Sequence, residues 1–290
     1  MDGAAVSAAG GKGARLPLRV GQHTHAAADS TVRLQGNAVN SMVSSGKDLV
    51  SPYSAPLQVL VIGTDTGVGK TRVVGLLAAG LRALGRPVWV HKPVACGGWD
   101  GATAEDAREL GRLLGAGREA QPPTTLCPWQ FPEPASPHLA ARQAGVRLTL
   151  PELVAAVDRC RPVPGDPHDL VVEGIGGLLV PLTAERQTVA DLAVATRLPV
   201  VIVTRPHLGT LNHTCLTVEA ARHHGISVLG LVLNHHTAVD DSLAVRSAAG
   251  ELTALTGLPL LATLPFAPHT PPSPVAVALA EAVLRRTVAL

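Results

Sequence analysis

"VLVIGTDTGVGKTRVV", residues 59–74, is the stretch most informative about the fold of this chain. The stretch begins as an apolar strand and ends in the Gly-Lys-Thr tripeptide (69–71) of a phosphate-binding loop that leads into a helix. In the usual spacing, Gly-x-x-x-x-Gly-Lys-Ser/Thr, the first glycine would stand at position 64, but this chain has Thr64 there and Gly63 one residue earlier. Because a glycine-rich turn between a strand and a helix offers backbone N–H groups to phosphate, the stretch predicts a nucleotide site despite the shifted glycine.

The rest of the chain from residue 57 onward continues the alternation of strands and helices. The expected strands are continuous apolar runs rather than alternating ones, which indicates strands buried on both faces of a parallel sheet. We therefore predict an α/β fold, a doubly wound parallel sheet of the P-loop NTPase type, with residues 115–136 irregular. The strands are expected at 58–62, 87–91, 169–174, 199–204, 227–234 and 258–265, and the helices near 70–84, 103–114, 151–160, 188–196, 209–223, 240–256 and 274–287, with a short helix after 136.

The composition argues against a nucleic-acid-binding protein and against a membrane-spanning one. The 290 residues carry a formal net charge of only +2, with Lys and Arg scattered, which disfavours a nucleic-acid surface. No apolar run reaches the roughly 18 residues that a membrane-spanning helix needs, so we expect no membrane partner. The four cysteines lie at least 30 residues apart and form no CxxC pair, which favours free thiols in a reducing compartment and predicts a cytoplasmic location.

Residues 1–56 differ in composition from residues 57–290. They are rich in Ala, Gly, Ser and Val and show no sustained hydrophobic period, so we predict a disordered extension followed by one nucleotide-binding domain. The two methionines of the chain are Met1 and Met42. One hypothesis is that natural translation begins at Met42, which lies shortly before the first strand.

Three charged side chains stand where parallel strands end or where a helix begins. Lys92 follows the second strand, and Glu173 closes the strand that starts at 169. Because the carboxyl ends of parallel strands face one crevice, both are candidates for phosphoryl-transfer chemistry, the lysine as a counter-charge and the acid beside Mg²⁺. Asp106 lies in the first turn of a helix, and the residues alone leave open whether it is a ligand or only a partner of the helix dipole.

Six segments together resemble the ATP-dependent dethiobiotin synthetase family over roughly residues 57–268. They are "GTDTGVGKT" (63–71), "KPVACG" (92–97), "SPHLAA" (136–141), "VEGIGGLLVPL" (172–182), "LGTLNHTCLTVEAARHHGI" (208–226) and "GLVLN" (230–234). The shifted glycine of the loop is normal for this family. The resemblance implies an enzyme of biotin biosynthesis with the cofactors ATP and Mg²⁺. Its substrates would be 7,8-diaminononanoate and CO₂, and its products dethiobiotin, ADP and phosphate, formed through a carbamate and a carbamic-phosphoric anhydride.

The resemblance also implies roles for individual residues. The active-site lysine falls on Lys92, and the Mg²⁺ ligands fall on Thr71, Asp106 and Glu173, which raises Asp106 from an open alternative to an expected ligand. The expected nucleotide contacts are Gly67, Val68, Gly69, Lys70, Thr71, Arg72, Asp106, Glu173, Gly174, Ile175, Gly176, Asn234, Pro265, Phe266 and Ala267, with the last four at the adenine. The expected substrate contacts are Thr66, Cys96, Leu211 and Asn212.

Family members are homodimers, and the resemblance implies that loop 208–213 of one subunit holds the carboxylate of the diamine bound by the other. An anionic tail suits a loop that opens a helix. The sequence departs from the family at Cys96, where a serine is common, so the substrate contact there is expected to be weaker or altered. It also has Gly67 where some members carry an acid, and residues 1–56 have no counterpart.

Three alternatives are less compatible with the residues. Cobyrinate-type amide-forming synthetases share a deviant loop but carry an added glutaminase domain, for which this chain has no room. Partition and septum-placement ATPases, a class of switching assembly proteins, carry a signature lysine at the position of Asp65, which has the wrong charge. A catalytically dead relative is opposed by the intact Lys70, Thr71, Lys92 and Glu173.

Overall fold

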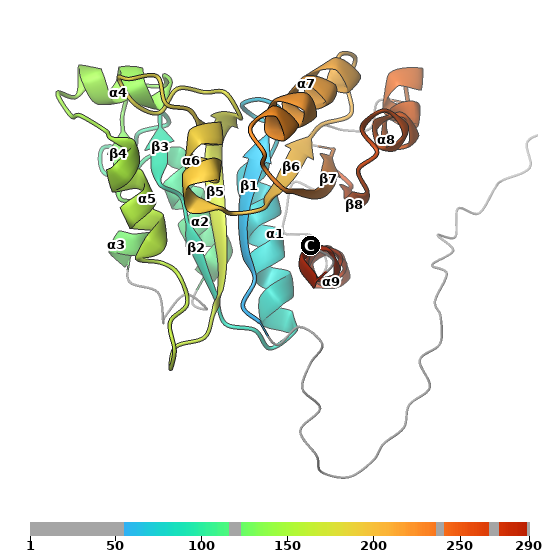
Figure 1. The fold of residues 1–290 in the computed structure, drawn as a ribbon, viewed down its shortest axis with the longest axis horizontal. Coiled ribbons are helices and arrows are strands. Elements are labelled where there is room, and N and C mark those ends of the chain that lie inside the picture. The colour runs from blue at the N-terminus through green and yellow to red at the C-terminus, as the bar shows by residue number, and fades with distance from the viewer. Residues whose placement is uncertain (1–54, 116–122, 236–240, 267–272, 289–290) are drawn as a thin grey trace, which may run out of the picture. The chain divides into compact units, whose positions relative to one another are not determined.

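The main sheet has six strands, all parallel, in the order β2-β5-β1-β6-β7-β8 (Figure 1). The structure is a computed structural model, and it describes residues 55–115, 123–235, 241–266 and 273–288. The strands are β1 (Gln58–Gly63), β2 (Val88–His91), β5 (Asp169–Gly177), β6 (Val200–Thr204), β7 (Val228–Asn234) and β8 (Leu260–Leu264). Every expected strand is confirmed within two or three residues at each end. The predicted extension, 1–56, lies outside the described residues except for its last two, so its boundary stays a prediction.

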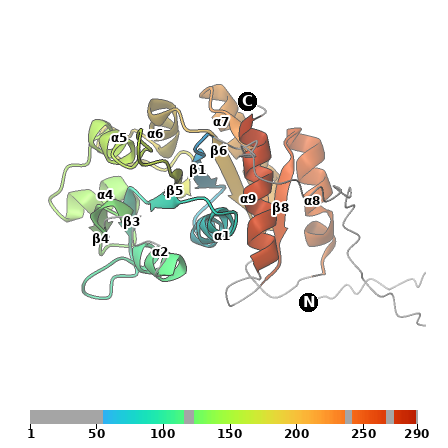
Figure 2. The same cartoon turned by 90° about the horizontal axis from the view of Figure 1, so that it is seen from below.

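Helices cover both faces of the sheet because its strands are apolar on both sides. In β1, Leu60 and Ile62 belong to one hydrophobic cluster and Val59 and Val61 to another, as the alternation of side chains along a strand requires. The first cluster includes side chains of α5 (Leu150–Asp158), α6 (Val189–Thr196), α7 (Thr210–His223) and α8 (Leu243–Thr256). The second includes those of α1 (Lys70–Ala83), α2 (Glu105–Leu114) and α9 (Ser273–Val288). Figure 2 shows α5, α6 and α7 on one side of the sheet and α1 and α2 on the other. The doubly wound prediction is confirmed.

A second, two-stranded parallel sheet was not predicted. It pairs β3 (Val94–Cys96) with β4 (Trp129–Phe131), and α3 (Pro123–Leu126) precedes β4 in the chain. The expectation that residues 115–136 are irregular is therefore wrong for α3 and β4. Three-residue strands are too short to show a hydrophobic period, and they form here because two segments over 30 residues apart meet. The small sheet is followed by α4 (Pro137–Gln143), and it places the residues just before this helix, 134–136, beside the phosphate loop.

Among the helices of the described residues, none combines the length and the apolar character required to cross a membrane.

Candidate active site

The phosphate loop runs from the end of β1 to the start of α1, and its glycines are needed for its shape. Gly67 and Gly69 have φ angles of 72° and 93°, a backbone region that favours glycine. A Cβ on Gly69 would lie 2.0 Å from Nδ2 of Asn234. A Cβ on Gly63 would lie 2.8 Å from both the carbonyl oxygen of Asp65 and a methyl carbon of Val68. The shifted glycine therefore stands where the loop folds back over the strand end.

Lys70, the lysine of the loop, is buried and turned into the loop. Its Nζ donates to the carbonyl oxygen of Asp65 at 3.0 Å. Burial, together with the nearby charge of Lys92, lowers the pKa of Lys70 to about 8. The charged form of Lys70 is thus destabilised by burial and by Lys92, and an anion bound in the loop would stabilise it.

Lys92, Glu173 and Asp106 form an ionic cluster next to this loop. Lys92 follows β2 and Glu173 lies on the neighbouring strand β5, where His91 pairs with Val172, so the two side chains start side by side. Nζ of Lys92 lies 2.7 Å from Oε1 of Glu173 and 2.9 Å from Oδ2 of Asp106. Lys92 has no exposed surface, and burial alone would lower its pKa, but the charges of Glu173 and Asp106 outweigh burial and raise the pKa of Lys92 above its ordinary value. Lys92 is therefore a permanent cation at neutral pH.

The same cluster offers oxygen ligands that suit Mg²⁺. Oγ1 of Thr71 donates to Oε1 of Glu173 at 2.8 Å, and Oε2 of Glu173 is buried and has no hydrogen-bond partner among the described residues. Although partial burial would raise it, Lys92 holds the pKa of Asp106 below its ordinary value, so Asp106 is ionised. Within the described residues no group of three or more His, Cys, Asp or Glu could hold a metal. A hydroxyl and two carboxylates nevertheless fit Mg²⁺, which takes few protein oxygens and completes its shell with water and phosphate.

A cavity of about 550 Å³ lies above this cluster and the loop. Ten of the residues predicted from the sequence line it, namely Thr66, Gly67, Gly69, Lys70, Thr71, Cys96, Asp106, Glu173, Ile175 and Gly176. Burial raises the pKa of the Cys96 thiol to about 11, so this side chain is neutral and can donate only a weak hydrogen bond. The far wall is formed by Pro134, Ala135, Ser136, Pro137 and Val180, which we did not predict as site residues. The "SPHLAA" motif was the signal that could have found Ser136 and Pro137.

The residues expected at the adenine lie on the other side of the loop, at the ends of β7 and β8. Asn234 is fully buried, and its Nδ2 donates to the carbonyl oxygen of Val68 at 2.9 Å. Nη1 of Arg72 donates to Oδ1 of Asn234, and Nη2 of Arg72 donates to the carbonyl oxygen of Pro265 at 2.8 Å. Phe266 is 41% exposed beside them. Ala267 lies outside the described residues.

Leu211 and Asn212 are not brought into the cavity. Both lie in the first turn of α7 and neither lines the cavity. Exposed leucines lie close by in the chain, with Leu208 exposed to 90% and Leu216, on the same helix, to 62%. Leu179 is 55% exposed and lines a cavity together with Leu216. Their expected contact with substrate bound to a partner subunit stays a prediction.

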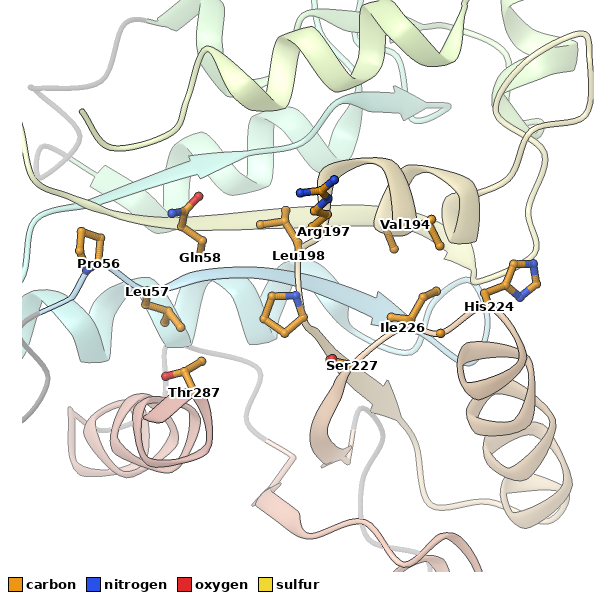
Figure 3. Close-up of a pocket in the computed structure, with 13 residues that line it drawn as sticks. Pro56, Leu57, Gln58, Val194, Arg197, Leu198, His224, Ile226, Ser227 and Thr287 are labelled. Atoms are coloured by element: carbon orange, nitrogen blue, oxygen red, sulfur yellow. The ribbon is translucent and has the colours of Figure 1, made fainter. Parts of the chain in front are cut away.

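A second large cavity, of about 490 Å³, lies at the opposite end of the sheet (Figure 3). Leu57 and Gln58 at the start of β1, Pro199 before β6 and Ser227 before β7 contribute to it. Its lining contains no Asp, Glu or Lys among the described residues. It is less suited to phosphoryl transfer than the cavity at the carboxyl ends.

Comparison with known proteins agrees with this geometry. A family model described as "AAA domain" matches residues 57–273. The chain is 42% identical to the ATP-dependent dethiobiotin synthetase of Anaeromyxobacter dehalogenans (strain 2CP-C), over 72% of this chain and 90% of the relative. The chain belongs to the dethiobiotin synthetase family. As a member of that family it is an enzyme.

Other relatives of the dethiobiotin synthetase family and one solved structure extend the comparison. The family's protein from Ralstonia nicotianae is 40% identical, over 72% of this chain and 89% of its own. A chain of the MinC:MinD cell division protein complex of Aquifex aeolicus has a TM-score of 0.50 at 12% identity, covering 81% of this chain and 96% of its own. At that identity the likeness shows the fold alone. It confirms the P-loop NTPase-like fold predicted from the sequence.

Proposed function

We propose that the chain closes the ureido ring of dethiobiotin from 7,8-diaminononanoate, CO₂ and ATP. One amine of the diamine adds to CO₂ and loses a proton, which gives a carbamate. A carbamate oxygen then attacks the γ-phosphorus, the bond to ADP breaks, and a carbamic-phosphoric anhydride forms. The second amine attacks the carbamate carbon, and phosphate leaves as the ring closes. Family membership supports this reaction, since relatives covered over most of their length are ATP-dependent dethiobiotin synthetases by name.

The buried cation Lys92 is the observation that carries the proposal. Its raised pKa excludes it as a base at neutral pH, so its role is to stabilise the negative charge of the carbamate and of the transferring phosphoryl group. The side chain of Asp106 is 44% exposed and that of Glu173 only 1%, so Asp106 is the partner that can turn away and open the ammonium to the cavity.

The phosphate loop and the cavity walls position the two substrates. Backbone N–H groups of residues 67–71 and Lys70 would hold the phosphates, and Thr66 and Cys96 face the same cavity for the diamine. Thr71, Asp106 and Glu173 would hold Mg²⁺, which supplies positive charge to the β- and γ-phosphates.

We further propose a homodimer in the cytoplasm. The exposed leucines next to loop 208–213 support a dimer, since burial of such an apolar surface favours association. The four free cysteines agree with a reducing compartment. Light scattering coupled to size exclusion measures the dimer, and Leu216→Asp is expected to shift it to monomer.

The decisive assay measures dethiobiotin by mass spectrometry and phosphate by colorimetry. Phosphate release is expected only when diamine, bicarbonate and Mg-ATP are all present, and in equal amount to dethiobiotin. Equal ATP hydrolysis without the diamine would contradict the proposal and favour a switch ATPase.

A further inference from the structure

Arg72 links the ends of two strands that lie beside the phosphate loop. It belongs to the first turn of α1, and its guanidinium reaches Asn234 at the end of β7 and Pro265 after β8. A third, longer contact of 3.4 Å joins Nη1 to the carbonyl oxygen of His235. All three acceptors are neutral, and none of the ion pairs within the described residues includes Arg72. Hydrogen bonds to neutral oxygens therefore hold the guanidinium in place, and no negatively charged partner among the described residues does so.

The direction of the nucleotide places its base at this bridge. β1, which leads into the loop, lies between β5 and β6 in the sheet. The reacting charges, Lys92 and Glu173, stand on the β5 and β2 side. A triphosphate whose γ-phosphate points to them must extend toward β6, β7 and β8, where Asn234 and Pro265 lie. This step rests on the proposed function, because it assumes that the γ-phosphate reacts at Lys92.

The bridge occupies the groups that adenine would need. The 6-amino group of adenine donates hydrogen bonds, and Oδ1 of Asn234 and the carbonyl oxygen of Pro265 are acceptors of the right kind. In the structure both already accept from Arg72, and Nδ2 of Asn234 is used by Val68. A guanidinium has only donors, so it suits the 6-oxo group of guanine better than the 6-amino group of adenine.

We propose that Arg72 determines the base selectivity of the enzyme by covering the two acceptors at the ends of β7 and β8. While the bridge stands, adenine must share both acceptors with the guanidinium, and guanine meets a donor. Discrimination between ATP and GTP is therefore weak. Removal of the guanidinium frees two acceptors, which pair with adenine and leave the 6-oxo group of guanine facing oxygen atoms.

The test compares Arg72→Leu with the wild type in kcat/KM for Mg-ATP divided by kcat/KM for Mg-GTP. The ratio is expected to rise about tenfold, the effect of one hydrogen bond gained by adenine and one acceptor left unpaired on guanine. A general loss of phosphate affinity or of folded protein cancels in this ratio. Arg112→Leu is the matched control, since Arg112 pairs with Glu109 on the surface of α2, and its ratio is expected to equal that of the wild type.

Two further measurements make the outcome unambiguous. Arg72→Lys keeps the charge but loses the planar fork whose two nitrogens reach Asn234 and Pro265 separately, so it is expected to raise the ratio as well. The ratio of the dissociation constants of ADP and GDP, measured by calorimetry without diamine, is expected to change in the same direction. An unchanged ratio in both Arg72 variants would overturn the inference. A wild type that makes no dethiobiotin would instead overturn the proposed function, while the diphosphate ratio would still test Arg72.

Discussion

The two ends of the proposed nucleotide site are built in opposite ways. At the reacting end, Lys92 is fully buried between two carboxylates, and every group in the cluster is charged or bonded to a charged group. At the base end, Arg72 is half-buried and bonded to neutral oxygens. Charges fixed in a buried place need little reorganisation when a phosphoryl group is transferred, whereas neutral contacts at a partly open site are readily exchanged for those of a ligand. We therefore expect the charges around Lys92 to be preorganised for phosphoryl transfer and the contacts of Arg72 to rearrange when a base binds.

Loss of the buried cation tests the reacting end with the largest expected effect. Lys92→Ala is expected to lower kcat by about 10³-fold or more, since it removes the charge that stabilises the transferring group and leaves Glu173 without its counter-ion. ATP binding, measured by calorimetry, is expected to stay within about threefold of the wild type, because Lys92 acts at the γ-phosphate and not at the base. Lys92→Met fills the space and separates lost charge from lost packing. Near wild-type turnover in either variant would show that the role of Lys92 is wrong.

The junction between the two ends is tested by a pair of glycine substitutions. Gly69→Ala places a methyl group 2.0 Å from Nδ2 of Asn234, at a φ of 93°, and is expected to raise KM for ATP by more than tenfold. Gly67→Ala is the control, with a similar positive φ of 72° but no atom within 4 Å of the added carbon. It carries only the backbone strain of about 1 kcal/mol, which corresponds to less than about tenfold. Equal effects of the two substitutions would show that contact with Asn234 does not shape the loop.

The pH dependence of nucleotide binding tests the loop with a smaller effect. The pKa of Lys70 is lowered to about 8 in the free protein, and bound phosphates would raise it. ADP binding above pH 8 is therefore expected to take up a proton, and the affinity to fall by up to tenfold from pH 8 to pH 9. Calorimetry in buffers of different ionisation enthalpy measures the uptake. At pH 6.5, where Lys70 is charged in both states, no buffer dependence from Lys70 is expected. Uptake of equal size at both pH values would contradict the assignment to Lys70.

Folding shifts the pKa values of Lys70 and Lys92 in opposite directions, so the two lysines make opposite contributions to the pH dependence of stability. A lysine whose pKa is lowered on folding destabilises the fold when charged, so stability should rise between pH 8 and about 10.4. Lys92, with its pKa raised, contributes stability that is present below about pH 10.4 and lost as pH rises through its higher value. The two contributions separate on the pH axis because Glu173 and Asp106 bond directly to Lys92 and outweigh its burial, whereas at Lys70 burial and the charge of Lys92 outweigh the carboxylates.

Most of the fold could be predicted from the sequence because its signals are local. A continuous apolar run such as 199–204 predicts a buried strand whatever lies beside it. The expectation that strands end at Lys92 and Glu173 placed both side chains in one crevice, although β5 continues past Glu173 to Gly177. The small sheet of β3 and β4 could not be predicted, since its strands form only through a contact with distant residues. The same holds for the cavity wall at Pro134–Pro137, which owes its place to that sheet.

Local sequence is enough to specify the phosphate loop with its shifted glycine, the parallel α/β order and the side chains that follow each strand. The contacts of Lys92 with both Glu173 and Asp106 become visible only in the folded chain. The same is true of the contacts of Arg72 with Asn234 and Pro265, which lie 162 and 193 positions away in the chain. The difference is one of range. Periodicity and turn chemistry depend on neighbours within a few residues, while these contacts depend on the order of strands in the sheet, which brings distant segments to one edge.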